Sequence, residues 1–476
     1  MSDNNIGREK VRAAQAPVRH AVDEPTEAKV GKKGIWGWML FDWAAQPFHT
    51  LIITFIFAPY FAASVAPDGV TGQAYWGYAA AIGGILIAAL SPVLGSIADA
   101  SGPRKPWIFG FSLLAIAGSI GLWWAEPNAG SSGVLFALVA FIITMIGFEF
   151  AAVFNNAMMP SLVPRAQLGR LSGNAWALGY IAGLLTLIVV LLTMATNSEG
   201  KTLLGIEPLF GIDASAKEGE RASGPLTGLW YLVFVIPLFL FTPDAEKKEK
   251  SKGAVKAGLQ GLWNTIKSLP QTPSLFAYLG SSMIYRDALN GLYTFGGIYA
   301  VGVLKWDIVQ VGIFGILANL TGVAGAFLGG RADAAKGPKF VVVTSVIVLM
   351  ISSLIIVTTS PTSALFMQLE SGSNLPTIVF YICGGFIGAA GGALQAASRT
   401  LMVDQAHPDR MAEAFGLYAL SGRATSFIAP LMIGIITTAT GSQQLGVAPV
   451  VVLFFLALLL LPLVKQKKPG ELSADG

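Results

Sequence analysis

The sequence predicts an all-α membrane protein with twelve transmembrane helices in two pseudo-symmetric bundles of six. Of its 476 residues, 54% are hydrophobic and only 12% are charged, and the mean hydropathy is +0.63. That composition excludes a soluble domain built around a single core. Long apolar runs recur along the chain, and a short motif of glycine and aspartate occurs once in each half. These observations indicate a duplicated bundle of membrane-crossing helices.

Twelve apolar segments supply the predicted spans, although the sixth is short. A helix needs roughly 20 residues to cross about 30 Å of hydrocarbon, and it satisfies its own backbone polar groups. In chain order we expect the spans at residues 35–62, 74–98, 107–125, 134–159, 172–194, 227–242, 274–301, 308–328, 340–360, 376–402, 412–438 and 446–464.

The basic residues orient these spans, because Lys and Arg collect in the short loops on the cytoplasmic side. With the N-terminus inside, 25 of the 31 Lys and Arg residues fall in inner regions and four in outer loops. The remaining two, Arg286 and Arg423, lie within apolar segments. We therefore expect both termini to be cytoplasmic. The net charge of +4 reflects this topology. The sequence has no patch of basic and aromatic residues, so we do not expect nucleic-acid binding.

The domain organisation follows from the spans. We expect the first bundle at residues 34–242 and the second at residues 274–464. Residues 1–33 mix charges and lack the apolar core of a signal peptide, so we expect a disordered cytoplasmic tail there. A second cytoplasmic tail is expected at residues 465–476.

The linker between the bundles, residues 243–273, has two parts. A run of charged residues is followed by spaced apolar residues from Val255 to Leu269, among them Trp263. Such a stretch can lie along the inner leaflet as an amphipathic helix with basic flanks. A solvated linker explains the pattern equally well.

A turn after the second segment recurs after the eighth. It contains Gly95, Asp99, Gly102, Arg104 and Lys105 in the first half, and Gly329, Asp333, Gly337 and Lys339 in the second. The turn resembles the signature loop of the major facilitator superfamily. The Asp99 carboxylate can accept hydrogen bonds from Arg104 or from a helix N-terminus, and Gly102 permits the tight turn. We expect these residues, with Asp333 and Lys339, to form a gate on the cytoplasmic side; a static topology anchor is the alternative.

Further blocks are similar to the vacuole effluxer-like family, the branch of that superfamily that contains autophagy-related vacuolar amino-acid exporters. This resemblance covers residues 35–464 and implies a twelve-helix facilitator. The chain departs from the family at Ala45 and Gln46, where Asn and Ser are usual, and at Arg286, where Asn is usual. The matching blocks are Phe41-Asp42-Trp43-Ala44, Asn156-Ala157-Met158-Met159-Pro160, Gly169-Arg170-Leu171-Ser172-Gly173, Asp287 with Asn290, Gln395-Ala396-Ala397-Ser398-Arg399 and Phe415-Gly416-Leu417-Tyr418.

Ionisable residues within the apolar segments are the candidate transport site, because a charge inside the bilayer normally faces a protein interior or a watery cavity. Asp42, near the inner side, either clasps a basic residue of a neighbouring helix or exchanges a proton. His49, near the middle, either exchanges protons near neutral pH or is hydrogen-bonded in the interior. Gln46 lies between them, and the departure there makes it a candidate cavity residue.

Glu149 is the leading candidate for a proton carrier. Its neighbours Phe148 and Phe150 are apolar, and desolvation favours the protonated carboxyl near neutral pH. A permanent ion pair within the first bundle is the alternative. Asn155 and Asn156 lie one to two turns below it, where they either extend a polar face or serve packing.

In the second half, Asp287 and Asn290 are three residues apart and share a helix face, so they are the candidate pair for an amine or a coupling proton. Arg423 either holds a substrate carboxylate through two hydrogen bonds or neutralises Asp287. Gln395 would add a neutral donor and acceptor. An α-amino acid carries one charge of each sign, which Asp287 or Glu149 would match together with Arg423.

We therefore expect a secondary active transporter that works by alternating access, with proton-coupled export of amino acids or similar small metabolites as the first choice. A proton symporter for uptake and a non-transporting receptor or scaffold are the alternatives. We find no catalytic constellation in the sequence and therefore expect no enzyme. We also expect no metal site or cofactor, because the histidines lie far apart and a single cysteine cannot complete a usual zinc site; these residues are His20, His49, His407 and Cys383. We expect a monomer in the bacterial inner membrane, with a small solute, protons and lipid as partners.

Overall fold

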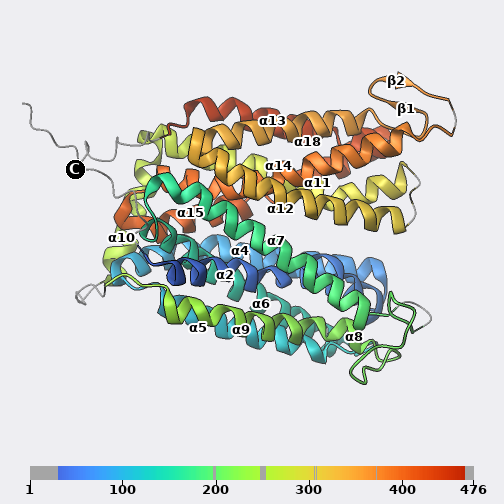
Figure 1. Ribbon diagram of the computed structural model, residues 1–476, viewed down its shortest axis with the longest axis horizontal. Helices are drawn as coiled ribbons and strands as arrows, with labels where there is room; N and C mark the ends of the chain where they lie inside the picture. The colour runs from blue at the N-terminus through green and yellow to red at the C-terminus, as the bar shows by residue number, and fades with distance from the viewer. Residues whose placement is uncertain are drawn as a thin grey trace, which may run out of the picture.

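The computed structural model describes residues 30–196, 200–246, 254–304, 306, 308–370 and 372–466. Most of both predicted tails and the charged part of the linker therefore lie outside the described residues. Within the described part, long α-helices predominate and run roughly parallel to one another (Figure 1).

The first bundle contains six long helical stretches, drawn from blue to green in Figure 1. They are α2 (Lys32–Pro47), continued by η1 (Phe48–Phe55), α3 (Phe57–Tyr60) and η2 (Phe61–Val65); α4 (Gly69–Ser101); α5 (Lys105–Gly121) with η3 (Leu122–Trp124); α6 (Gly130–Met158) with η4 (Met159–Ser161); α7 (Arg165–Thr193); and α9 (Ser223–Phe241), preceded by α8 (Glu218–Arg221).

The second bundle, from yellow to red, follows α10 (Ala254–Ser268) and η5 (Leu269–Gln271). It contains α11 (Pro273–Gly302); α12 (Ile308–Lys336); α13 (Pro338–Val357); α14 (Leu375–Gln405); η6 (Pro408–Arg410) with α15 (Met411–Arg423) and α16 (Ile428–Thr440); and α17 (Gln443–Gly446) with α18 (Ala448–Leu460) and η7 (Leu461–Leu463). The sequence did not predict the antiparallel hairpin of β1 (Ser363–Ala364) and β2 (Met367–Gln368), in which Ser363 is opposite Gln368.

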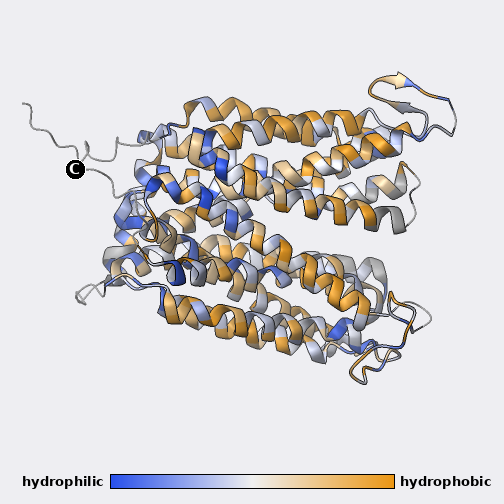
Figure 2. Cartoon of the chain, viewed as in Figure 1, coloured by the Kyte–Doolittle hydropathy of each residue, from blue (hydrophilic) through white to orange (hydrophobic). Residues whose placement is uncertain are grey.

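Within the described residues, eleven helical stretches are long and apolar enough to cross a membrane. The remaining long helix, α11, has 30 residues and carries Arg286 and Asp287. The predicted fold of twelve membrane-crossing helices in two bundles is thereby confirmed. Large apolar side chains such as Ile85, Leu240 and Leu328 are exposed, as expected for residues that face lipid. In Figure 2, hydrophobic residues predominate along the long helices.

Two of the spans are broken, and neither break was predicted. In the first, Pro47 has no N–H to donate to the helix, and the π-helical segment η1 follows it. In the eleventh, turn residues 424–427 separate α15 from α16. The backbone N–H of Ala429, near the start of α16, donates to Asp287 at 2.9 Å. The buried Asp287 carboxylate thus accepts a backbone hydrogen bond that the break in the helix leaves without a helical acceptor.

Glycines allow the bundles to approach closely. A Cβ atom on Gly173 of α7 would lie 2.5 Å from the carbonyl oxygen of Ala326 in α12. On Gly95 of α4 it would lie 2.3 Å from the carbonyl oxygen of Ala412 in α15. Small residues therefore seat each of these helices against the opposite bundle, as is usual between helices in membranes.

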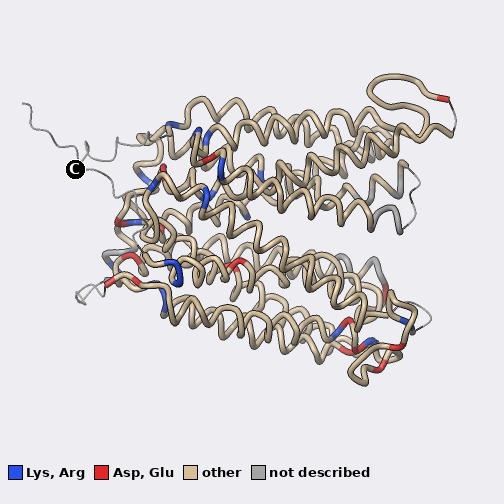
Figure 3. Tube along the Cα trace, viewed as in Figure 1, with Lys and Arg blue, Asp and Glu red and all other residues tan. Residues whose placement is uncertain are grey.

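One end of the molecule is marked by α10, and we call it the α10 end (Figure 1). Lys and Arg gather there together with several Asp and Glu residues, and a second group of charges of both signs lies at the other end, around α8 (Figure 3). The described linker residues form a helix over most of the stretch predicted to be amphipathic. Leu262 of this helix is buried, and Trp263 is exposed.

Candidate functional site

The Asp99 carboxylate joins the two bundles at the α10 end. It accepts hydrogen bonds from the backbone N–H groups of Ala412 and Glu413, at 3.1 and 2.8 Å, in the first turn of α15. It also forms an ion pair with Arg104 at 2.6 Å. The partially positive N-terminus of a helix favours a carboxylate in this position. Asp99 therefore ties the end of α4 to the opposite bundle.

The turn after α4 is held in place by local contacts. Gly102 has a φ angle of +99°, in the region that glycine adopts most readily. Its carbonyl oxygen accepts a hydrogen bond from Arg104 at 2.6 Å. Asp244, at the start of the linker, accepts from the backbone N–H groups of Arg104 and Lys105. These contacts fix the guanidinium next to Asp99.

An ion pair also joins the bundles at the same end. Arg165, the first residue of α7, donates two hydrogen bonds of 2.5 Å to the Asp404 carboxylate near the end of α14. Both side chains are largely buried. A bidentate pair of this kind is geometrically specific, so it fixes how α7 and α14 meet.

The repeated turn in the second half has different contacts. The Asp333 carboxylate is buried against Gly169 of α7, and neither oxygen has a hydrogen-bond partner among the described residues. Lys339 donates to the carbonyl oxygen of Val464 at 2.7 Å. In the described part of the chain it forms no salt bridge with Asp333. The two turns of the predicted gate therefore differ: the first contains an ion pair, and the second contains a carboxylate packed on a glycine.

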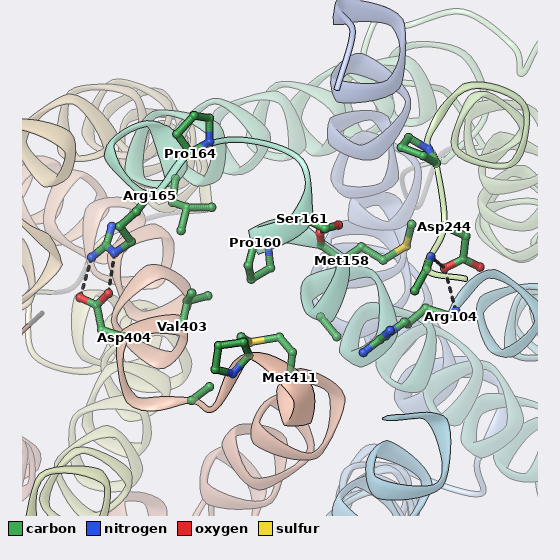
Figure 4. Close-up of a pocket in the computed structure, with 16 residues that line it drawn as sticks. Arg104, Met158, Pro160, Ser161, Pro164, Arg165, Asp244, Val403, Asp404 and Met411 are labelled. Atoms are coloured by element: carbon green, nitrogen blue, oxygen red, sulfur yellow. Dashed lines mark hydrogen bonds and ion pairs between the residues drawn. The ribbon is translucent and has the colours of Figure 1, made fainter. Parts of the chain in front are cut away.

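A pocket of about 430 Å³ lies between these contacts and is lined by both bundles (Figure 4). Arg104 and Asp244 lie at one side of it, and Arg165 and Asp404 at the other (Figure 4). The remaining lining is mostly apolar, with Met158, Pro160, Pro164, Leu168, Pro243, Val403, Pro408 and Met411. The four labelled charged groups are engaged with one another or with backbone groups, so the pocket offers chiefly an apolar surface.

Further towards the middle of the interface, Arg399 of α14 reaches into the first bundle. Its guanidinium is 2.9 Å from the Asp42 carboxylate, and it donates to the side-chain oxygen of Asn156 at 3.1 Å. It also donates to both the hydroxyl and the carbonyl oxygen of Ser172. Arg399 thus links α14 to α2, α6 and α7 at once. Asp42 thus has a basic partner from another helix, which is the contact that the clasp alternative requires.

Glu149 and Arg423 form a third ion pair between the bundles, from α6 to α15. The two side chains are 20% and 28% exposed, so this pair is not sealed in the core. His49 and Arg286 also interact electrostatically with Glu149. Residues from the first, fourth, seventh and eleventh spans are thereby brought together. The alternative of an ion pair for Glu149 within the first bundle does not describe this contact, because Arg423 belongs to the second.

The candidate residues of α11 separate. Asp287 is buried and accepts from Ala429, and it forms no salt bridge with Arg423 in the described part of the chain, whereas Asn290 is exposed. Viewed along the helix axis, Asn290 is closer to Arg286 than to Asp287. Four residues separate Asn290 from Arg286, which is a net rotation of about 40°, and three separate it from Asp287, which is about 60°.

The neutral candidates fall into two groups. Gln395 donates to the Tyr180 hydroxyl at 3.1 Å, across the bundle interface. Gln46 lies against Gly179 and Gly183 of α7. Asn155 is fully buried, and its side-chain amide has no hydrogen-bond partner among the described residues. Gln395 and Gln46 therefore line helix contacts near the interface, whereas Asn155 is enclosed by packing.

Arg399, Asp404 and Arg165 form ion pairs across the interface and were not among the predicted site residues. We counted Arg399 and Arg165 as inner basic residues that only set the topology. Arg399 follows Gln395 by four residues and so shares its helix face, a spacing that could have revealed it. Nothing local in the sequence indicates that Arg165 and Asp404, 239 residues apart, would meet. No group of three or more His, Cys, Asp or Glu residues in the described ranges could hold a metal ion.

The fold is shared with solved membrane transporters. The proton:xylose symporter XylE matches with a TM-score of 0.66 at 14% identity, covering 92% of this chain and 95% of that one. The transporter FucP in its outward conformation matches with a TM-score of 0.67 at 14% identity, covering 92% of this chain and 100% of that one. These matches establish the fold, which is the one seen in XylE and FucP.

The family follows from the sequence. The model of the vacuole effluxer Atg22-like family matches residues 30–471, and the chain belongs to this family. An uncharacterized MFS-type transporter, YxiO, of Bacillus subtilis is 25% identical over 92% of this chain and 96% of its own length. Autophagy-related protein 22-2 of Emericella nidulans is 26% identical over 67% of this chain. The chain spans 55% of that fungal relative.

Proposed function

We propose that the protein is a secondary active transporter that exports amino acids or similar small metabolites in exchange for protons. The observation that carries this proposal is the Glu149–Arg423 ion pair, which joins α6 of the first bundle to the end of α15 in the second and remains partly exposed. A titratable group and a cation meet there at the interface where transporters of this fold bind solutes near the midplane. Export agrees with the description of the family as effluxers.

Alternating access would proceed by rocking of the two bundles about this central pair. The contacts of Asp99, Arg165 and Arg399 hold the α10 end closed. For the solute to enter from that end, these contacts must break while the bundles themselves stay intact. Such a change is a rigid-body rotation between two packed states, the usual switching mode for paired domains.

Proton coupling would act on Glu149. As a carboxylate, it holds the Arg423 guanidinium across the interface. Protonation removes the negative charge and hence the attraction between the bundles. A proton arriving from one side would therefore loosen the central contact and allow the bundles to rock.

We place the α10 end in the cytoplasm of a bacterial inner membrane, with the protein as a monomer. Lys and Arg gather at this end (Figure 3), and cytoplasmic loops carry an excess of these residues. The full-length match to a Bacillus protein supports a bacterial plasma membrane.

Transport by purified protein in liposomes tests the proposal. Vesicles loaded with radiolabelled amino acids and hydroxy acids would be diluted into buffer of the same or a lower pH. We expect an inward proton gradient to accelerate release from vesicles in which the α10 end faces the lumen. Accumulation of the solute together with protons would instead establish an uptake symporter. Lack of exchange for every solute, even without a gradient, would favour a receptor or scaffold.

A further inference from the structure

Arg286 is a cation of α11 that packs against α15 and forms no salt bridge with another described residue. Its guanidinium lies 4.2 Å from the centre of the Tyr418 ring and donates to the Tyr418 carbonyl oxygen at 2.8 Å. Gly422 makes room for it, because a Cβ atom there would lie 2.3 Å from the Arg286 Cζ. In the described part of the chain, no Asp or Glu forms a salt bridge with Arg286.

The acidic residues near the interface are already engaged. Glu149 is held by Arg423, and Asp42 by Arg399. Asp287, the neighbour of Arg286 in sequence, points to the N-terminus of α16. Arg286 therefore has no carboxylate in a salt bridge of its own among the described residues, because Glu149 pairs with Arg423 and Asp287 accepts from the Ala429 backbone. A cation within a membrane protein normally pairs with another group or marks the path of an ion or substrate.

We propose that the Arg286 guanidinium selects the solute: this transporter carries small organic anions, and Arg286 binds their carboxylate group. The proposal rests on the proposed transport function and narrows its substrate class. Tyr418 occupies one edge and one face of the guanidinium, which leaves other N–H groups to bind a carboxylate side by side. Asn290 lies close to Arg286 around α11, so it can bond a neutral polar group of the same solute.

Among the solutes of the proposed function, the same geometry favours a hydroxy acid over an α-amino acid. Its ammonium group would need an acidic partner, but the nearby Glu149 carboxylate is held by Arg423. A hydroxy acid of the same size has the carboxylate without the ammonium, so it balances the charge of Arg286. We therefore expect lactate to be preferred over alanine, which differs from it only by an ammonium in place of the hydroxyl.

Two measurements on the purified full chain test this inference. Exchange of labelled lactate, malate, phosphate and alanine is measured in liposomes without a pH gradient. Thermal unfolding in detergent with the same compounds, at constant ionic strength, reports binding independently of transport. Both are repeated on Arg286→Gln, on Arg286→Lys, and on Arg331→Gln as a control, since Arg331 is an exposed arginine packed on Phe327.

We expect the wild type to exchange lactate or malate at least tenfold faster than alanine. Arg286→Gln should lose that exchange and the thermal shift, Arg286→Lys should keep part of both, and Arg331→Gln should match the wild type. Equal anion exchange by Arg286→Gln, or a preference for alanine or phosphate, overturns the inference while transport stands. A carboxylate-dependent thermal shift that requires Arg286, without any exchange, would instead refute transport and support the anion site.

Discussion

Arg399 of α14 lies 2.9 Å from the carboxylate of Asp42 in α2, and this ion pair is one of those that join the two bundles. The Arg399 side chain is 5% exposed and the Asp42 side chain 18%. The pair is therefore largely removed from solvent, where the loss of one partner leaves an uncompensated charge. Its stability is linked to the closed arrangement of the α10 end, because the partners belong to different bundles.

Breaking this pair should destabilise the protein and favour opening of the α10 end. We expect Asp42→Asn and Arg399→Gln each to lower the free energy of unfolding by about 3 kcal/mol, the lower part of the range for a broken buried pair. The double variant should lose less than the sum of the two, since both changes remove one interaction. Denaturant titration in detergent measures all three, with Asp213→Asn in an exposed loop as the control. Strictly additive losses would show that the pair is not coupled.

Asp99→Asn should shift the resting population towards opening at the α10 end. The neutral amide loses the ion pair with Arg104 and accepts more weakly from the N-terminus of α15. In a Cys383→Ser background, a cysteine at Val403, which lines the pocket in Figure 4, should then react several-fold faster with a water-soluble maleimide.

The control for this labelling is Asp68→Asn, which changes the same residue type at the opposite end of α4, where Asp68 accepts from the Thr71 backbone. That variant should leave the reactivity of the Val403 cysteine unchanged. If Asp99→Asn behaves like Asp68→Asn, the latch is not what closes the α10 end.

The fold could be predicted from sequence because the bilayer imposes a simple rule on length and hydropathy. Each of the twelve predicted segments overlaps one of the long helical stretches. The breaks could not be predicted, because they depend on tertiary partners. Turn residues 424–427 are tolerated where Asp287 receives the freed N–H of Ala429, and these two are 142 residues apart.

Which residues become site candidates could be predicted, but their pairing could not. The cost of a charge within an apolar segment singled out Asp42, Glu149 and Arg423, and all three lie in contacts between the bundles. The predicted pairing of Asp287 with Asn290 depended on helix spacing alone. Spacing does not reveal which helix face meets a neighbour, and here Asp287 faces the start of α16.

Glu149→Gln should abolish transport driven by a pH gradient and spare exchange without a gradient. The amide keeps the shape of the carboxyl and one acceptor for Arg423, but it cannot take up a proton. Flux of the labelled solute with and without a gradient measures the two activities. Glu207→Gln, in an exposed loop, is the matched control and should keep both. Equal loss of both activities in Glu149→Gln would assign the residue to solute binding or structure.

Gly169→Ala should weaken the contact between α7 and α12 at the α10 end. A Cβ atom at Gly169 would lie 2.5 Å from the carboxyl carbon of Asp333, and the buried carboxylate has little space to move. Overpacking of this kind typically costs about 1–3 kcal/mol. Because the two residues belong to different bundles, we expect the cost to appear as easier opening, measured by faster labelling of the Val403 cysteine.

Gly110→Ala is the matched control for that substitution. Gly110 lies within α5, and a Cβ atom there would meet no other group within 4 Å. Alanine also has the higher helix propensity, so this variant should be as stable as the wild type or more stable by up to about 1 kcal/mol. If Gly169→Ala labels no faster than Gly110→Ala, the packing of Asp333 on α7 does not hold the α10 end closed, and the gate consists of the contacts of Asp99, Arg165 and Arg399.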